Sequence, residues 1–137
     1  MIKEIDNLIT EYHIEKVILE EVLPKNEAYD DGANHHANPK VFKPLMWLQG
    51  GIALMIYVNH NHKQEKEIKI EYILPNSWRS KVGIRTGRGI KRENLKIADI
   101  KFAKDTFGID VNDDVADACG IGWAYIKDSQ KQVFNWQ

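Results

Sequence analysis

The sequence predicts an α/β domain, because strand and helix patterns alternate along a chain of ordinary single-domain length. Two short apolar runs, 17–22 and 68–74, have the pattern of strands. Longer segments before, between and after them have the apolar spacing or the end signals of helices. Of the 137 residues we assign 1–126 to one domain and 127–137 to a C-terminal tail.

The N-terminal part is predicted to form a helix, a strand and a loop. Ile2, Ile5 and Ile9 recur at helical spacing within residues 2–13. The run 17–22 is almost continuously apolar, which is typical of a buried parallel strand. Residues 24–38 are polar and indicate a loop.

The next helix has no polar face. Pro39 or Pro44 is predicted to open it, since proline suits a first helical turn. Between Leu45 and Val58 the only polar side chain is Gln49. Such a helix has to be covered on every side, so we expect a homodimer that forms through helix 45–58.

The C-terminal half is predicted to be mainly helical after the second strand. Residues 59–66 are interpreted as a polar turn, although Asn59-His60-Asn61-His62 has the letters of an HNH nuclease without the hairpin that such a site needs. Pro75 precedes a short helix, for which Asn76 or Ser77 is the expected cap. A helix over 91–107 ends at Gly108, and a last helix runs from Asn112 or Asp113 to about Ile126.

Composition indicates a soluble intracellular protein. The net charge is −1, and one cysteine, Cys119, excludes an internal disulfide. No apolar run is long enough to cross a bilayer, and the first residues do not resemble a signal peptide. We therefore expect a cytoplasmic location.

Basic residues concentrate in one segment. Residues 79–104 hold nine basic and two acidic residues, whereas the remainder holds ten basic and eighteen acidic ones. Three glycines interrupt this run, and glycine lets a backbone approach a ligand closely. The pattern favours a phosphate-facing surface over a merely solvated helix face. The candidate DNA-binding residues are Arg79, Lys81, Arg85, Arg88, Lys91, Arg92 and Lys96.

Three acidic residues are candidate metal ligands. Glu20 ends the first strand, and Asp114 and Asp117 are three apart at the start of the last helix, where they share one face. Clustered carboxylates are stable beside Mg²⁺ or Mn²⁺, which would supply the chemistry of phosphodiester hydrolysis. The alternative is a helix start whose acids only stabilise the helix.

These segments together resemble the RuvC-like Holliday junction resolvases, above all the short bacteriophage type. Leu19-Glu20-Glu21-Val22 is similar to the strand motif that carries the family's second acid, and Asp114-Val115-Ala116-Asp117-Ala118 is similar to its closing motif. Pro75-Asn76-Ser77-Trp78-Arg79 with the basic run resembles the segment before that motif, and helix 45–58 falls where the family dimerises.

The resemblance implies an RNase H-like fold and a Mg²⁺- or Mn²⁺-dependent endonuclease for branched DNA, in a bacterial cell or a phage-infected host. In that case Glu20, Asp114 and Asp117 are catalytic and bind the metal. The family's first strand and its catalytic Asp have no counterpart, because Asp6 lies on an amphipathic helix. We therefore expect an N-terminally truncated sheet with packed helices, and a weak or inactive nuclease. The alternatives are a non-catalytic dimeric DNA-binding remnant and an assembly subunit of an RNase H-like nuclease.

Overall fold

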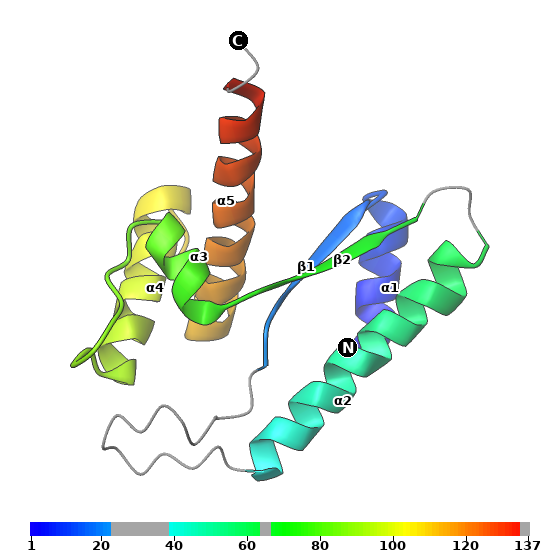
Figure 1. The fold of residues 1–137 in the computed structure, drawn as a ribbon, viewed down its shortest axis with the longest axis horizontal. Coiled ribbons are helices and arrows are strands. Elements are labelled where there is room, and N and C mark those ends of the chain that lie inside the picture. Colours follow the sequence, from blue (N-terminus) through cyan, green and yellow to red (C-terminus); the bar gives the residue numbers. More distant parts are fainter. Residues whose placement is uncertain (23–38, 64–66, 135–137) are drawn as a thin grey trace. The chain divides into compact units, whose positions relative to one another are not determined.

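The computed structural model describes residues 1–22, 39–63 and 67–134, and it confirms the α/β class (Figure 1). Two compact units divide the chain, Met1–Tyr72 and Ile73–Gln137. The assignment of 1–126 to a single domain stays a prediction. The elements are α1 (Ile2–Glu11), β1 (Lys16–Glu20), α2 (Pro39–Ile56), η1 (Tyr57–Asn61), β2 (Lys69–Ile73), α3 (Pro75–Lys81), α4 (Arg92–Phe107) and α5 (Asp113–Phe134).

In the first unit, α1 and α2 pack against each other around an isoleucine core. Ile9, Ile52, Ile56 and Ile68 are buried there, as the spacing of apolar residues on α1 predicts. The two helices approach closely at Gly51, where an added Cβ would lie 2.9 Å from Ile2 Cδ1. A larger side chain at Gly51 would therefore require the end of the Ile2 side chain to move.

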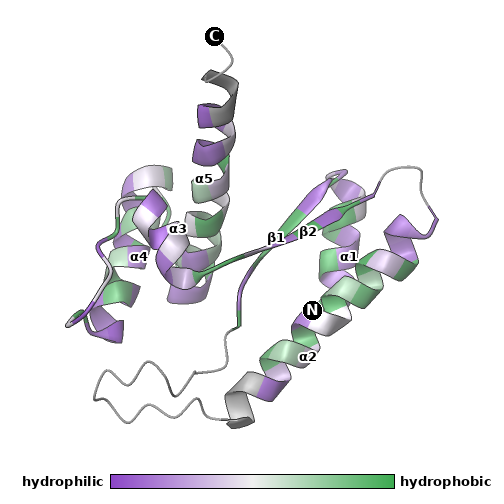
Figure 2. Ribbon diagram, in the orientation of Figure 1, coloured by the Kyte–Doolittle hydropathy of each residue, from purple (hydrophilic) through white to green (hydrophobic). Residues whose placement is uncertain are grey.

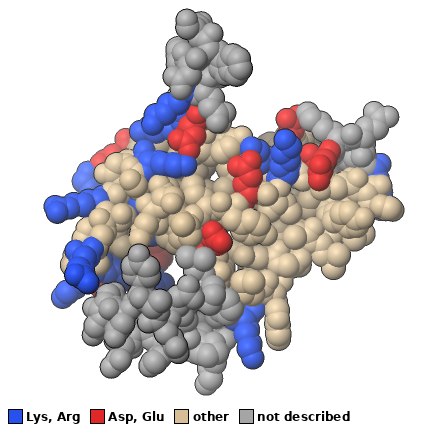
Figure 3. Space-filling view, viewed as in Figure 1, with Lys and Arg blue, Asp and Glu red and all other residues tan. Residues whose placement is uncertain are grey.

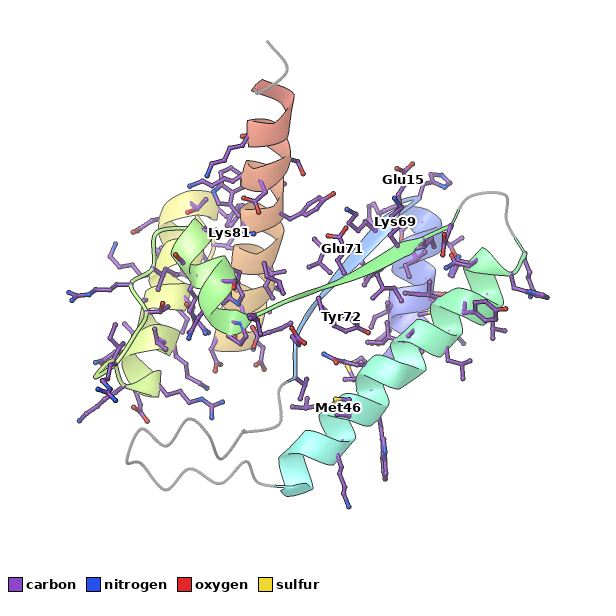
Figure 4. All side chains as sticks on the ribbon, viewed as in Figure 1. Glu15, Met46, Lys69, Glu71, Tyr72 and Lys81 are labelled. Atoms are coloured by element: carbon purple, nitrogen blue, oxygen red, sulfur yellow. The ribbon has the colours of Figure 1, made fainter. Side chains whose placement is uncertain are left out.

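The sheet has two parallel strands, β1 and β2, among the residues that the structure describes. Lys16 Nζ of β1 donates a hydrogen bond of 2.5 Å to Glu71 Oε1 of β2, and Glu71 is labelled in Figure 4. At the other end of β1, the Gln49 side chain donates a 2.6 Å hydrogen bond to the Glu20 carbonyl. Gln49, the one polar side chain between Leu45 and Val58, thus connects α2 to the end of β1.

Residues 57–61 form a π-helix, so the predicted polar turn over 59–66 was wrong for 59–61; residues 62 and 63 form a turn, and 64–66 lie outside the described residues. The wider turn accommodates a buried His60, whose Nε2 lies 2.6 Å from Asp6 Oδ1 on α1. Asn61 binds both backbone groups of Ile68: its Nδ2 donates to the carbonyl at 3.1 Å and its Oδ1 accepts from the amide at 2.7 Å. Tertiary hydrogen bonds of this kind leave no periodic signal in the sequence.

The second unit consists of α3, α4 and α5 around a fully buried Trp78. Trp78 lies directly against Gly120 of α5, where an added Cβ would come within 2.2 Å of Trp78 Cζ3. Ala103 of α4 and Ala116 and Ala124 of α5 are fully buried as well, because small side chains let α4 and α5 pack closely. Trp78 is therefore a packing residue at the centre of the second unit.

Helix ends were predicted with mixed success. Gly108 ends α4 in the left-handed conformation with φ of 71°, and Asn112 Oδ1 accepts a 3.0 Å hydrogen bond from the Val115 amide at the start of α5. The cap of α3 was predicted wrongly, because Pro75 takes the first helical position and Leu74 precedes it. Helix α5 continues to Phe134 instead of ending near Ile126.

Helix α2 begins at Pro39 and contains Pro44. No helix in the described part of the chain combines the length and the apolar character that crossing a bilayer requires.

Candidate nucleic-acid interface

Arg79 is buried and differs in this respect from most of the predicted DNA-binding set. Its Nε lies 3.1 Å from both carboxylate oxygens of Asp99, and its Nη2 lies 2.7 Å from Asp99 Oδ2. Its guanidinium carbon lies 4.6 Å from the centroid of the Trp78 ring. Asp99 is fully buried, so this ion pair belongs to the interior of the second unit. In this conformation Arg79 supports the fold and presents no charge to a ligand.

Two predicted DNA-binding lysines also pair with acids of the second unit. Lys81, labelled in Figure 4, bonds to Asp128 of α5, and Lys96 of α4 bonds to Asp113. The hydrogen bond and the positive charge of Lys96 hold the pKa of Asp113 below its ordinary value of 3.8. These pairs connect helices, and their cations are partly neutralised.

The other four predicted residues, Arg85, Arg88, Lys91 and Arg92, are exposed. They lie on residues 82–92, which connect α3 to the first residue of α4 and which we call the basic loop. Within the described residues of the second unit, the recorded ion pairs use other cations and leave these four without an acidic partner. Figure 3 shows basic side chains projecting along the edge of the unit near this loop.

Backbone geometry gives the basic loop a defined shape. Gly83, Gly87 and Gly89 have φ of 87°, 134° and 86°, values that side-chain-bearing residues rarely adopt. The Ile84 amide donates a 2.9 Å hydrogen bond to the Arg79 carbonyl, which attaches the loop to the end of α3. These turns and this hydrogen bond set the path of the backbone along which the cations lie.

The three predicted acidic ligands lie in different parts of the chain. Asp114 and Asp117 lie on α5, where Asp114 is exposed and Asp117 is half-buried. Asp117 Oδ1 lies 3.5 Å from Arg79 Nη2, at the limit of a hydrogen bond. Glu20 belongs to the first unit, so the grouping of all three carboxylates stays a prediction.

The donor chemistry of these residues suits a hard cation, but the described residues do not form a complete metal centre. Carboxylate oxygens are the ligands that Mg²⁺ and Mn²⁺ prefer. Among the described residues, however, no group of three or more His, Cys, Asp or Glu side chains is placed to hold an ion. The second unit by itself supplies two of the three candidate ligands, Asp114 and Asp117, and Asp117 already contacts Arg79.

Sequence reasoning missed the contact between Asp6 and His60. Asp6 Oδ2 also accepts a 3.1 Å hydrogen bond from Asn59 Nδ2, so one carboxylate binds two residues of η1. The two partners are 54 residues apart in the chain, and only the HNH-like letters at 59–62 drew attention to this segment. The contact fastens η1 to α1.

No protein-family model, curated protein or solved structure matches this chain.

Proposed function

We propose that this protein binds branched DNA through the basic loop. The single observation that carries the proposal is the set of four exposed cations that have no acidic partner among the described residues, on a segment where three glycines take positive φ. The five other basic residues of 79–104 bond to carboxylates. Such a group of cations attracts the phosphates of a nucleic acid, and this attraction does not depend on the base sequence.

The nuclease part of the proposal rests on the resemblance to RuvC-like resolvases and on the RNase H-like fold that this resemblance implies. Glu20, Asp114 and Asp117 would be the catalytic carboxylates, with Mg²⁺ or Mn²⁺ supplying a nucleophile at neutral pH. The position of Asp114 in the first turn of α5 and of Asp117 one turn later supports their assignment to one site. Because two-metal hydrolysis depends on complete preorganisation, we expect weak turnover or none.

Helix α2 supports the proposal of a homodimer. Trp47 is 76% exposed, Leu54 is 63% exposed and Val58 is 45% exposed. At 100° per residue the Trp47 and Leu54 side chains share a stripe of α2 opposite the buried Ile52 and Ile56, and Val58 follows them in η1. Figure 2 shows hydrophobic positions along α2, and Met46, labelled in Figure 4, is also exposed. Large exposed apolar side chains that share one helix face are characteristic of a protein–protein contact.

The test of DNA binding is the affinity for a synthetic four-way junction over a range of salt concentrations. The variant Arg85→Ala/Arg88→Ala/Arg92→Ala should bind more weakly, and its slope of log affinity against log salt should be flatter by about 2.7, at about 0.9 per lost phosphate contact. The control is Lys104→Ala, which removes an α4 lysine that already bonds to Asp110. Equal losses in both variants would show that binding depends on charge in general and not on the basic loop.

Cleavage of the same junction with Mn²⁺ tests the nuclease part. Asp114→Asn is the informative variant, because Asp114 is exposed and its replacement should leave the fold intact. Slow cleavage that this variant abolishes, with junction binding unchanged, would support a catalytic role. Tight binding without cleavage in the unmodified protein would favour the non-catalytic DNA-binding alternative.

A further inference from the structure

An open groove of about 470 Å³ lies in the second unit beside the basic loop. The floor is apolar and comes from the end of α3, the loop and α4. It consists of Val82, Ile84, Ile90, Leu95, Ala98 and Phe102. The volume falls within the range of pockets that bind small organic molecules.

Polar groups are confined to the rim of this groove. Arg85 stands on the loop side, and Asn94 presents an amide, which both donates and accepts hydrogen bonds. Lys101 and Asp105 bond to each other on the α4 side, so that part of the rim is neutral. The net positive charge is therefore on the loop side, where Arg88, Lys91 and Arg92 follow, which have no acidic partner in the part of the chain that the structure describes.

We propose that the groove binds one unpaired nucleotide of branched DNA, with its base against the apolar floor and its phosphate beside Arg85. This inference rests on the proposed function and specifies the part of the DNA that is recognised. A base is a flat, largely apolar ring with polar edges, and it is joined to an anion. The groove matches these three properties with its floor, the Asn94 amide and the loop cations.

The geometry favours an unpaired nucleotide over a duplex. In a duplex the bases are stacked, and extracting one costs a few kcal/mol. Extraction costs least where a base is unpaired, as at a bulge, a flap or an open branch point, so the groove adds affinity there and little on continuous duplex. The basic loop would bind phosphates in both cases, and the groove would supply selectivity for branched over linear DNA.

The test compares the unmodified protein on matched DNA probes. One probe carries a single unpaired nucleotide, a second carries an abasic residue at the same position, and a third is a continuous duplex. We expect the abasic probe to bind about tenfold more weakly than the first, since a base stacked on an aromatic side chain contributes roughly 1–3 kcal/mol and Phe102 is the aromatic residue of the floor. Equal affinity for the first two probes would overturn the groove proposal, while loss of binding to every probe would overturn the proposed function itself.

A matched pair of variants locates the effect. Ala98→Met fills the groove without changing the charge, whereas Ile97→Met changes an exposed neighbour on α4 that does not line the groove. Ala98→Met should bind the unpaired and abasic probes equally, and Ile97→Met should retain the tenfold preference. If Ala98→Met kept the preference for the unpaired probe, the groove would not hold a nucleotide. The same conclusion would follow if an acidic leucine-containing peptide displaced the unpaired and abasic probes equally well.

If Ala98→Met does not fold, Asn94→Ala is the second variant. Asn94 is exposed and lines the rim, so its replacement removes an edge contact without disturbing the core. It should lower the preference for the unpaired probe severalfold and leave duplex affinity unchanged. An unchanged preference would contradict the assigned orientation of the base.

Discussion

Replacing Gly120 by alanine should destabilise the second unit through one contact. The new Cβ would lie 2.2, 2.7 and 3.0 Å from three atoms of the Trp78 six-membered ring. Trp78 is fully buried, and Arg79 covers its ring. The indole therefore cannot turn aside, and α3 and α5 have to separate or the ring has to leave its position.

Two opposing effects decide the magnitude. Overpacking a core costs about 1–3 kcal/mol or more, whereas glycine to alanine inside a helix gains up to about 1 kcal/mol. With a contact as short as 2.2 Å the cost should be at or above the top of its range, which leaves a net loss of about 2 kcal/mol in the free energy of unfolding. For a chain of this length that corresponds to a fall in Tm of about 8 °C.

Gly122→Ala is the matched control. Gly122 lies on the same helix, and no atom lies within 4 Å of an added Cβ there, so this variant should be slightly stabilised. Thermal unfolding followed by circular dichroism measures both variants. If Gly120→Ala is as stable as Gly122→Ala, the packing of Trp78 on Gly120 is not as described.

Three further predictions concern charge and association. Asp99→Asn should lower the free energy of unfolding by about 3 kcal/mol, because it leaves a buried guanidinium without its main partner, whereas the exposed control Asp105→Asn should change it by less than about 0.5 kcal/mol in chemical denaturation. Asp113→Asn should be less stable than the unmodified protein above pH 4, because the pKa of Asp113 is lower in the folded state than in the unfolded state. The difference in stability should disappear as the pH falls through the folded-state pKa of Asp113. Melting curves between pH 2 and 7 would measure this difference. Leu54→Glu should shift a dimer toward monomer in light scattering with the helical content intact, whereas Tyr72→Glu on β2, also an exposed apolar position, should not; a monomer before any substitution would refute the association.

Local patterns in the sequence predicted most of the elements. The spacing of Ile2, Ile5 and Ile9 predicted α1, and the apolar run at 17–22 predicted β1, which the structure places at Lys16–Glu20. Gly108 predicted the end of α4 correctly, because the left-handed conformation there strongly favours glycine. These signals are local, and each depends on a few neighbouring residues.

Features that depend on distant residues were not predicted. Arg79 was counted with the surface cations because it lies in a basic run. Nothing in the spacing of residues along the sequence indicated that Arg79 would form a buried ion pair with Asp99. Asp6 and His60 likewise meet only in the folded first unit. The groove beside the basic loop also depends on how the loop lies against α4, which composition does not reveal.

The bonds between Asn61 and Ile68 have a consequence for strand alignment. A side-chain amide that engages both backbone groups of one residue imitates a neighbouring strand and fixes the position at which β2 begins. Ile68 and Ile70 then face the core, and Lys69 and Glu71 point outward. A shift of one residue would reverse these faces and place two charges against the isoleucines. In a sheet of only two described strands, few other contacts oppose such a shift. Asn61 therefore helps to set the register of β2.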